Sequence, residues 1–504
     1  MKHTPLLAGL ALLALLGGAM DVAHRLDENP VVGTVTIGPD PGTLVVDTQT
    51  ERAFIGDQSS ARVDVLDTAR GTLVRTVAVA PSPAGTQVDD LAADERLGRV
   101  FVLSAPSLGS PLLRGYVSLL DARSGRLLRT TPVTLGGALG WLAVDRRTRR
   151  VFVLGFPDYL PVGTTPDPVR DAVRVSVLDA LSGRLVRALA LPLPPQPLGS
   201  GAFAGSPLGV DQRTKRVFVS RFDGARVSVL DAASGRLLRT VTLRGRRRAM
   251  TVTTWDEDAP VVDARTNRVF VGDVRRGTFS MLDAASGQLL RTTALPVAVY
   301  PSAPVVDARA GRVFVVDGAG VSVFDAGTGR LLHRIVVRRN APRFPPLAVV
   351  VDARHGRAFV VARSTGTVGV LDSRSGRVLR TLSVGGRLGG AVVDSGAGRL
   401  VVTIGGAPTQ AGTLAGPGLV GVLDGRSGAL LRTIRVGSGP RAVAVDERTG
   451  HAVVVTCGGT LPAPATWGWL PVPAWLRQGL PVLPSPGPRT RTTSPSVSVL
   501  DLTH

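Results

Sequence analysis

Short apolar runs alternate with short polar, turn-forming segments along most of the chain. Runs such as Val100–Leu103, Val117–Leu120 and Leu127–Thr130 are bounded by Asp, Ser and Gly. This is the pattern of β-strands joined by hairpin turns. The repeats do not sustain the 3.6-residue period of an amphipathic helix, so the pattern predicts an all-β protein that is almost free of helix.

Two phrases recur in alternation, and each contains a fixed aspartate. The phrase V-S-V-L-D-A-x-S-G-R-L-L-R-T places its aspartate at Asp67, Asp121, Asp179, Asp231, Asp283, Asp325, Asp372, Asp424 and Asp501. The phrase V-D-x-R-T-x-R-V-F-V precedes it, with Asp47, Asp94, Asp145, Asp211, Asp263, Asp307, Asp352, Asp394 and Asp446. Repeats of about fifty residues, each with the turn signals of four strands, predict a β-propeller of about nine blades.

The two ends of the chain complement each other. The ninth copy stops at Val497–Asp501, before its fourth strand, whereas Val31–Ile37 precedes the first complete copy and matches a fourth strand such as Leu238–Leu243. We therefore expect the N-terminal strand to complete the last blade. One ring of about nine four-stranded blades would be closed in this way.

The phrases Val227–Asp231 and Val436–Asp446 resemble those of the YVTN, or YncE-like, β-propeller family, and the resemblance extends over residues 31–504. It implies a bacterial envelope or secreted repeat protein without an agreed catalytic set. This chain has Phe where that family often has Tyr, and Asp-x-Arg-Thr in place of its Pro-Asp-Gly turn. Its nine repeats also exceed the seven blades that the resemblance implies.

The N-terminus carries an export signal. Lys2 and His3 precede the apolar run Leu6–Met20, which has the length of a secretory h-region and is short for a membrane span. We predict a signal peptide or uncleaved anchor over 1–19, a linker over 20–30, and a propeller over 31–504 with a loop insertion at 457–495. The protein is then secreted or held in the cell envelope, and it contacts a membrane only through an uncleaved N-terminal segment.

The net positive charge of the chain bears on the kind of partner that it could bind. The 504 residues include 59 Lys+Arg and 38 Asp+Glu, a net charge of +21, and one cysteine, which excludes a disulfide framework. About half of the arginines occupy repeat positions, where a structural role beside the repeat aspartates is favoured. Export disfavours nucleic acid as the partner. A protein, a glycan or an anionic envelope polymer fits the compartment, and we expect a monomer.

Strand order predicts which face binds. The loop between the second and third strands shares a face with the connection to the next blade, and long insertions at 104–115, 155–172, 405–419 and 457–495 fall on this loop-rich face. Binding is usually carried by variable loops on a rigid scaffold. The candidate partner-binding residues there are Trp467, Trp469, Trp475, Trp255, Arg244, Arg246, Arg247, Arg248, Arg338, Arg339 and Arg343.

Catalytic signatures are missing from the sequence. His333, His355 and His451 stand where other repeats carry Arg or Thr, and none belongs to a known metal or nucleophile motif. Acidic residues after the second strands, such as Asp57 and Asp273, match turn formers better than a calcium loop. We therefore predict a non-enzymatic binding scaffold without cofactor or metal. The alternative is a lactonase-like or quinoprotein-like enzyme that acts in the central channel.

Overall fold

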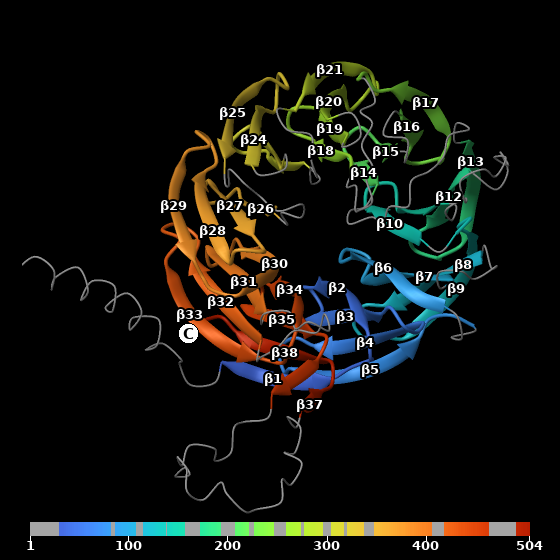
Figure 1. Cartoon of the computed structure of the whole chain (residues 1–504). Helices are drawn as coiled ribbons and strands as arrows, with labels where there is room; N and C mark the ends of the chain where they lie inside the picture. The colour runs from blue at the N-terminus through green and yellow to red at the C-terminus, as the bar shows by residue number, and fades with distance from the viewer. Residues whose placement is uncertain are drawn as a thin grey trace, which may run out of the picture.

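The computed structural model describes residues 30–81, 86–106, 114–137, 139–156, 172–192, 207–220, 226–245, 259–273, 277–295, 304–316, 320–336, 347–405, 418–462 and 490–503. Nine four-stranded antiparallel sheets surround a common axis (Figure 1), and no helix occurs among these residues. This confirms the predicted single propeller of nine blades. The innermost strands of the blades face the axis, and the fourth strands form the circumference (Figure 1).

The first three blades follow the chain in order. Blade 1 comprises β2 (Pro41–Asp47), β3 (Arg52–Asp57), β4 (Arg62–Asp67) and β5 (Thr72–Ala78). Blade 2 comprises β6 (Thr86–Asp94), β7 (Arg99–Pro106), β8 (Arg114–Asp121) and β9 (Leu127–Thr134). Blade 3 comprises β10 (Leu139–Asp145), β11 (Arg150–Phe156), β12 (Ala172–Asp179) and β13 (Leu185–Pro192).

The next three blades keep the same order with shorter inner strands. Blade 4 comprises β14 (Leu208–Asp211), β15 (Arg216–Ser220), β16 (Arg226–Asp231) and β17 (Leu237–Thr242). Blade 5 comprises β18 (Val261–Asp263), β19 (Arg268–Asp273), β20 (Thr278–Asp283) and β21 (Leu289–Ala294). Blade 6 comprises β22 (Val305–Asp307), β23 (Arg312–Val316), β24 (Gly320–Asp325) and β25 (Leu331–Val336).

The last three blades include the one that joins both ends of the ring. Blade 7 comprises β26 (Leu347–Asp352), β27 (Arg357–Ala362), β28 (Thr367–Asp372) and β29 (Val378–Ser383). Blade 8 comprises β30 (Arg387–Asp394), β31 (Arg399–Gly405), β32 (Gly418–Asp424) and β33 (Leu430–Val436). Blade 9 comprises β34 (Pro440–Asp446), β35 (His451–Thr456), β38 (Ser496–Asp501) and β1 (Val31–Thr36). A separate ribbon of β36 (Gly459–Pro462) and β37 (Thr490–Thr493) forms within the predicted insertion.

The core lies between neighbouring blades. In seven blades the second strand carries a fully buried phenylalanine: Phe54, Phe101, Phe152, Phe218, Phe270, Phe314 and Phe359. Phe54 packs in one cluster with Val63 of its own blade and Val102 of blade 2. Because each cluster draws on two blades, no blade buries its apolar side chains alone, and radial stacking supplies the missing cover.

The N-terminal strand closes the ring as predicted. β1 pairs antiparallel with β38, with Val35 opposite Val497 and Thr34 opposite Ser498 (Figure 1). Val35 then packs with side chains of blades 9 and 1. Gly33 occupies the position at which seven of the other fourth strands carry Arg and blade 6 carries His333. Its backbone lies against Gly71 of blade 1.

One ion pair recurs at the end of the third strands. Its aspartate closes its own turn, and an arginine at the start of the second strand binds it: Arg52–Asp67, Arg99–Asp121, Arg150–Asp179, Arg216–Asp231, Arg268–Asp283, Arg312–Asp325 and Arg357–Asp372. In blade 3, Arg150 Nη1 lies 2.8 Å from Asp179 Oδ2, while its Nε donates to the carbonyl oxygen of Ala233 in blade 4 at 3.1 Å. We call the seven arginines of these pairs the clasp arginines.

The aspartates of the V-D-x-R-T phrase do not pair with arginine in the described part of the chain, although the sequence suggested that both aspartate series could. Asp145 and Asp211 are fully buried and accept hydrogen bonds from their own turns, including Thr148 Oγ1 and Thr214 Oγ1. Among the described residues, no arginine forms an ion pair with either of them. The arginines therefore pair with one of the two aspartate series.

We expect Gly33→Ala to lower the free energy of unfolding by about 1–3 kcal/mol. A Cβ atom at residue 33 would lie 2.3 Å from the Gly71 carbonyl oxygen, so the closing strand would have to move. Thr36→Ala, at an exposed position of the same strand, is the control and should change stability by less than about 0.5 kcal/mol. Urea unfolding measures both, and equal midpoints for the two variants would contradict a closing role for β1.

Candidate functional site

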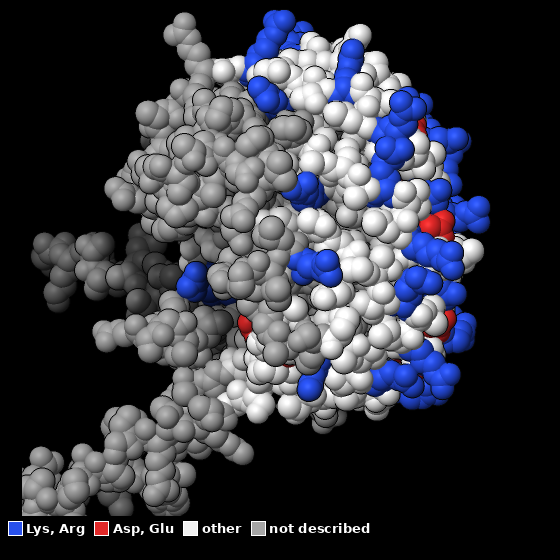
Figure 2. Space-filling view, turned by 90° about the vertical axis from the view of Figure 1, so that its right-hand side faces the viewer, with Lys and Arg blue, Asp and Glu red and all other residues white. Residues whose placement is uncertain are grey.

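The turns that join first to second strands and third to fourth strands lie on one side of the ring, which we call the hairpin face. Every blade exposes at least one basic residue there: Arg70, Arg96, Arg123, Arg126, Arg147, Arg149, Arg184, Arg213, Lys215, Arg236, Arg265, Arg309, Arg330, Arg354, Arg374, Arg377, Arg426 and Arg448. Figure 2, an edge-on view, shows Lys and Arg gathered along one edge with few acidic atoms between them. The exposed side chains of the hairpin face are therefore predominantly basic.

The aspartates of these turns keep their negative charge but are less exposed than the arginines. Asp121, for example, accepts hydrogen bonds from the backbone N–H and the hydroxyl of Ser124 at 2.9 and 2.7 Å, which hold its carboxylate inside the turn. Burial raises the pKa of Asp121, but these hydrogen bonds and the Arg99 guanidinium outweigh it and hold the pKa below its usual value. The remaining turn acids are Glu51, Glu95 and Glu447.

A pair of carboxylates joins the inner strands of blades 2 and 3. Asp89 Oδ2 accepts a hydrogen bond from the Gly140 N–H at 3.0 Å, and Asp90 Oδ2 accepts one from the Leu142 N–H at 2.7 Å. Successive residues of a regular strand point to opposite faces, but β6 has a bulge between Val88 and Asp90. The bulge lets both carboxylates reach the free edge of β10.

The same two carboxylates have raised pKa values. Burial raises the pKa of Asp89 to about 7 against hydrogen bonds from Gln87 and Gly140, and the charge of Asp90 adds to the rise. Burial likewise raises the pKa of Asp90 to about 6 against the backbone N–H groups of Leu142 and Leu91. Both residues are only half-buried, so solvent still reaches them. This is the arrangement of described residues that comes closest to acid–base chemistry.

The sequence analysis missed this pair because it assigned the acids to turns. Asp89 and Asp90 stand five and four residues before the repeat aspartate Asp94, where blade 1 has Gly42 and Thr43. That departure from the repeat was a usable signal. The bulge and the contact with β10 were not visible in it, because both depend on pairing between distant segments.

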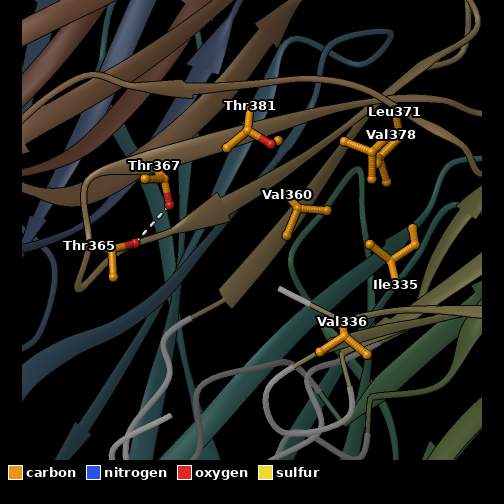
Figure 3. A pocket seen from close by; sticks show the side chains of 9 residues that line it. Ile335, Val336, Val360, Thr365, Thr367, Leu371, Val378 and Thr381 are labelled. Carbon is orange, nitrogen blue, oxygen red and sulfur yellow. Dashed lines mark hydrogen bonds between the residues drawn. The ribbon is translucent and has the colours of Figure 1, made fainter. Parts of the chain in front are cut away.

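A cavity of about 310 Å³ opens between blades 6 and 7. Ile335 and Val336 of β25 face Val360 and Leu371 of blade 7 across it, and the hydroxyls of Thr365 and Thr367 lie 2.7 Å apart at one end (Figure 3). Gly369 stands where most blades have Ser, and the space that a side chain would fill there is open. Its lining has no charged residue, so the cavity offers apolar contact and hydroxyl groups only.

Most of the sequence-predicted binding residues lie outside the described residues. These are Trp467, Trp469, Trp475, Trp255, Arg246, Arg247, Arg248, Arg338, Arg339 and Arg343. Arg244 is described: it is exposed after β17 and lines a groove of about 430 Å³ together with Thr278 and Arg291 of blade 5. The predicted set as a whole therefore stays a prediction.

The three internal histidines occupy the repeat positions assigned to them. His355 Nδ1 donates to Asp352 Oδ2 at 2.8 Å, as threonine does in blades 3 to 5. His451 takes the place of a clasp arginine, and its Nδ1 donates to the Thr68 carbonyl oxygen of blade 1 at 2.7 Å. His333 lies on β25 beside Gly376 of blade 7. Each therefore contacts a turn of its own or the next blade.

The described part of the chain offers neither a metal-binding cluster nor a membrane-spanning helix. His, Cys, Asp and Glu do not gather there in groups of three or more that could hold a metal ion. Within the same residues, no helix has the length and apolar character needed to cross a bilayer.

Comparisons with known proteins support the fold class. Residues 223–454 match the PQQ_2 family model, described as outer membrane protein assembly factor BamB. A search of curated proteins gave no match. The match covers less than half of the chain and indicates similarity to a β-propeller repeat family.

Solved structures with a similar arrangement share little sequence with this chain. The computationally designed Ika8 protein is 18% identical, with a TM-score of 0.45, 74% of this chain covered and 96% of that one. The dihydro-heme d1 dehydrogenase NirN is 14% identical, with a TM-score of 0.46 and coverages of 71% and 74%. Sqt1 of Saccharomyces cerevisiae is 10% identical, with a TM-score of 0.49 and coverages of 82% and 100%. At these values the similarity does not extend to function.

We expect Asp89→Asn to stabilise the protein at about pH 8, by roughly 1–3 kcal/mol. The pKa of Asp89 is raised in the folded state, so its ionisation costs stability, and that cost grows as the pH rises from the unfolded pKa of about 4 through about 7. The gain should therefore vanish near pH 4. The free energy of unfolding, measured by urea across this range, tests the expectation.

Asp121→Asn is the contrasting variant. The pKa of Asp121 is lowered, so its carboxylate contributes stability above the unfolded pKa and loses it as the pH falls through the folded pKa. We expect this variant to be destabilised at pH 8. If both variants were destabilised equally there, the assignment of Asp89 would be wrong.

We expect Gly369→Ser to raise the free energy of unfolding by about 0.5–1 kcal/mol. The nearest atom to a Cβ at residue 369 is Val360 Cβ, at 3.8 Å, and the new hydroxyl would face Thr381, as Ser118 faces Thr130 at 2.9 Å in blade 2. Gly421→Ser is the matched control, because its Cβ would lie 3.3 Å from Ile404 Cδ1 and would crowd that side chain. A smaller gain in Gly369→Ser than in Gly421→Ser would contradict this account of the cavity.

Proposed function

We propose that this protein is an envelope-associated β-propeller of the YVTN/YncE-like kind that acts as a binding scaffold. Its loop-rich face would recognise a protein, a glycan or an anionic envelope polymer. Support for the envelope comes from the export signal that the sequence predicts at the N-terminus and from the match of residues 223–454 to a family described by an outer membrane assembly factor.

The observation that carries the proposal is that loop length varies on one face of the ring only. On the hairpin face, turns of nearly constant length repeat the same aspartate hydrogen bonds from blade to blade. The long insertions join β7 to β8, β11 to β12, β31 to β32 and β35 to β38, whose joined ends all point to the opposite face. Blades 8, 9, 2 and 3 are neighbours around blade 1, so these insertions leave the ring along one arc.

The ribbon of β36 and β37 supports a special role for the largest insertion. Gly459 pairs with Thr493 and Pro462 with Thr490, so residues 463–489 leave from a paired base. This segment contains Trp467, Trp469 and Trp475, and tryptophan is frequent among the residues that anchor protein interfaces. We infer that this insertion carries the main partner contact.

An enzyme that works at the ring axis is the second candidate. It is favoured by Asp89 and Asp90, because carboxyl groups with pKa values near neutrality suit general acid–base catalysis. The binding scaffold is preferred because hydrogen bonds to Gly140 and Leu142 already give this pair a structural role between blades 2 and 3.

Replacement of residues 463–489 by a short Gly-containing turn should leave thermal unfolding nearly unchanged and reduce partner capture from envelope extract at least about tenfold. The triple variant Trp467→Ala, Trp469→Ala, Trp475→Ala should show the same loss. Replacement of exposed arginines on the hairpin face is the control and should leave capture intact. If the truncated protein and the triple variant both unfold early, the insertion is a structural cover and the binding site lies elsewhere.

A further inference from the structure

The circumference of the ring next to the hairpin face carries exposed apolar side chains. Each of blades 1 to 7 exposes at least one aliphatic residue at the start of its fourth strand, directly after the turn. Leu128 is 49% exposed, Leu238 50% and Leu379 52%. Single exposed leucines are ordinary, but the same feature in seven successive blades forms a continuous surface.

Exposed arginines flank these apolar residues. In blade 2, Arg126 and Arg129 enclose Leu127 and Leu128, and the same order recurs in blades 3, 4 and 7. Each such unit therefore presents aliphatic carbon between two guanidinium groups at the edge of the hairpin face. Apolar groups combined with basic side chains are typical of proteins that bind at the surface of anionic membranes.

We propose that the hairpin face docks on an anionic lipid bilayer. The turn arginines would bind lipid phosphates, and the leucines at the rim would enter the headgroup boundary. This adds a membrane contact to the one that an uncleaved N-terminal segment would make. The proposal concerns the hairpin face, whereas the proposed function concerns the loop-rich face, so it does not depend on the proposed function.

The repetition of this surface around the ring favours a bilayer over other occupants. Because the turns have nearly constant lengths, the blades present the same groups at the same level. A soluble anionic polymer would satisfy the arginines and leave the leucines in water, and a protein partner would match the side chains of a few blades only. A bilayer presents phosphate and apolar carbon together along the whole face.

A groove on the hairpin face can accept an anionic headgroup. It has a volume of about 470 Å³ between blades 6 and 7, and it is lined by Arg309, Arg354 and Arg374. Two carboxylates also line it: Asp307 is fully buried, and Asp372 is paired with the clasp arginine of blade 7. All three arginines are exposed. Bidentate binding to phosphate is a common use of arginine, so the groove offers several donors to one headgroup.

The chain entry point agrees with this orientation. β1 begins on the hairpin face, where the Pro30 carbonyl oxygen accepts a hydrogen bond from the Asp501 N–H at 2.7 Å. Residues 21–29 connect this point to the apolar run Leu6–Met20. The N-terminal segment therefore joins the ring on the side that we place on the membrane, and the loop-rich face points away from it.

The test compares two variants of the full chain that each lose five positive charges. The hairpin variant carries Arg126→Gln, Arg184→Gln, Arg236→Gln, Arg330→Gln and Arg377→Gln, and blade 5 already has Gln288 at this position. The control carries Arg62→Gln, Arg114→Gln, Arg363→Gln, Arg387→Gln and Arg435→Gln, which are exposed residues toward the loop-rich face. Flotation measures binding to vesicles of phosphatidylcholine alone and of an equimolar mixture with phosphatidylglycerol.

The readout is the extra binding that phosphatidylglycerol causes, because binding through the apolar N-terminal segment is common to all variants and to both vesicle types. We expect the hairpin variant to lose this increment at least about tenfold and the control to keep it. A third variant, Leu128→Thr, Leu238→Thr, Leu379→Thr, should bind the mixed vesicles several-fold more weakly with its charge unchanged.

Three results would overturn the proposal. The first is a wild type that shows no increment with phosphatidylglycerol, and the second is an equal loss in the two arginine variants, which would indicate an unspecific charge effect. The third is binding of soluble dextran sulfate to the wild type through the five hairpin arginines, together with a leucine variant that floats with the mixed vesicles as the wild type does. That result would assign the face to a soluble polyanion.

Discussion

Every blade of this ring depends on its neighbour, and the carboxylate at the end of the third strand makes that dependence specific. Asp179 closes its own turn through Ser182 and also holds Arg150, whose Nε reaches the turn of the next blade at Ala233. One aspartate thus fixes a turn, an ion pair and a blade junction. Such partly exposed pairs are each worth roughly 0.5–1 kcal/mol, so their effect comes from repetition around the ring.

The closing junction between blades 9 and 1 uses other residues for the same purpose. His451 replaces the clasp arginine and reaches the Thr68 carbonyl oxygen, while the Thr68 hydroxyl donates to Asp446 Oδ2 at 2.6 Å. Gly33 replaces the arginine of the fourth strand and allows close backbone contact with Gly71. Arg448 and Arg441 of blade 9 add ion pairs to Glu51 and Asp40 on the blade 1 side. The closing junction therefore combines short backbone and hydroxyl contacts with arginine pairs.

The architecture could be predicted from the sequence because the residues that form the turns between strands are local in sequence. Asp121 and Gly125 mark a turn wherever the phrase occurs, and the positive φ of Gly125, 66°, is the conformation that this turn requires. The absence of a fourth strand at the end of the ninth repeat, and its replacement by Val31–Thr36, was likewise visible in the sequence.

The contacts at the blade junctions could not be predicted from the sequence, because the aspartate that binds Arg150 is decided by the geometry of the blades. The Asp89–Asp90 pair and the Gly369 cavity show the same limit: both are departures from the repeat whose consequences appear only when β6 meets β10, or blade 6 meets blade 7.

The two faces of the ring are subject to different constraints. A turn on the hairpin face cannot lengthen without breaking the hydrogen bonds that its aspartate makes, and the clasp arginine would lose the carbonyl oxygen that it binds. Several surface arginines of these turns bond the next blade, as Arg147 does when it donates to the Arg213 carbonyl oxygen at 3.1 Å. At the position of Arg126, by contrast, blade 5 has Gln288, so a neutral side chain fits there. A glutamine would satisfy the fold, so the folding requirement alone does not account for the exposed charge. The recurrence of arginine at this one position is therefore the feature of the hairpin face that the proposed membrane contact would explain.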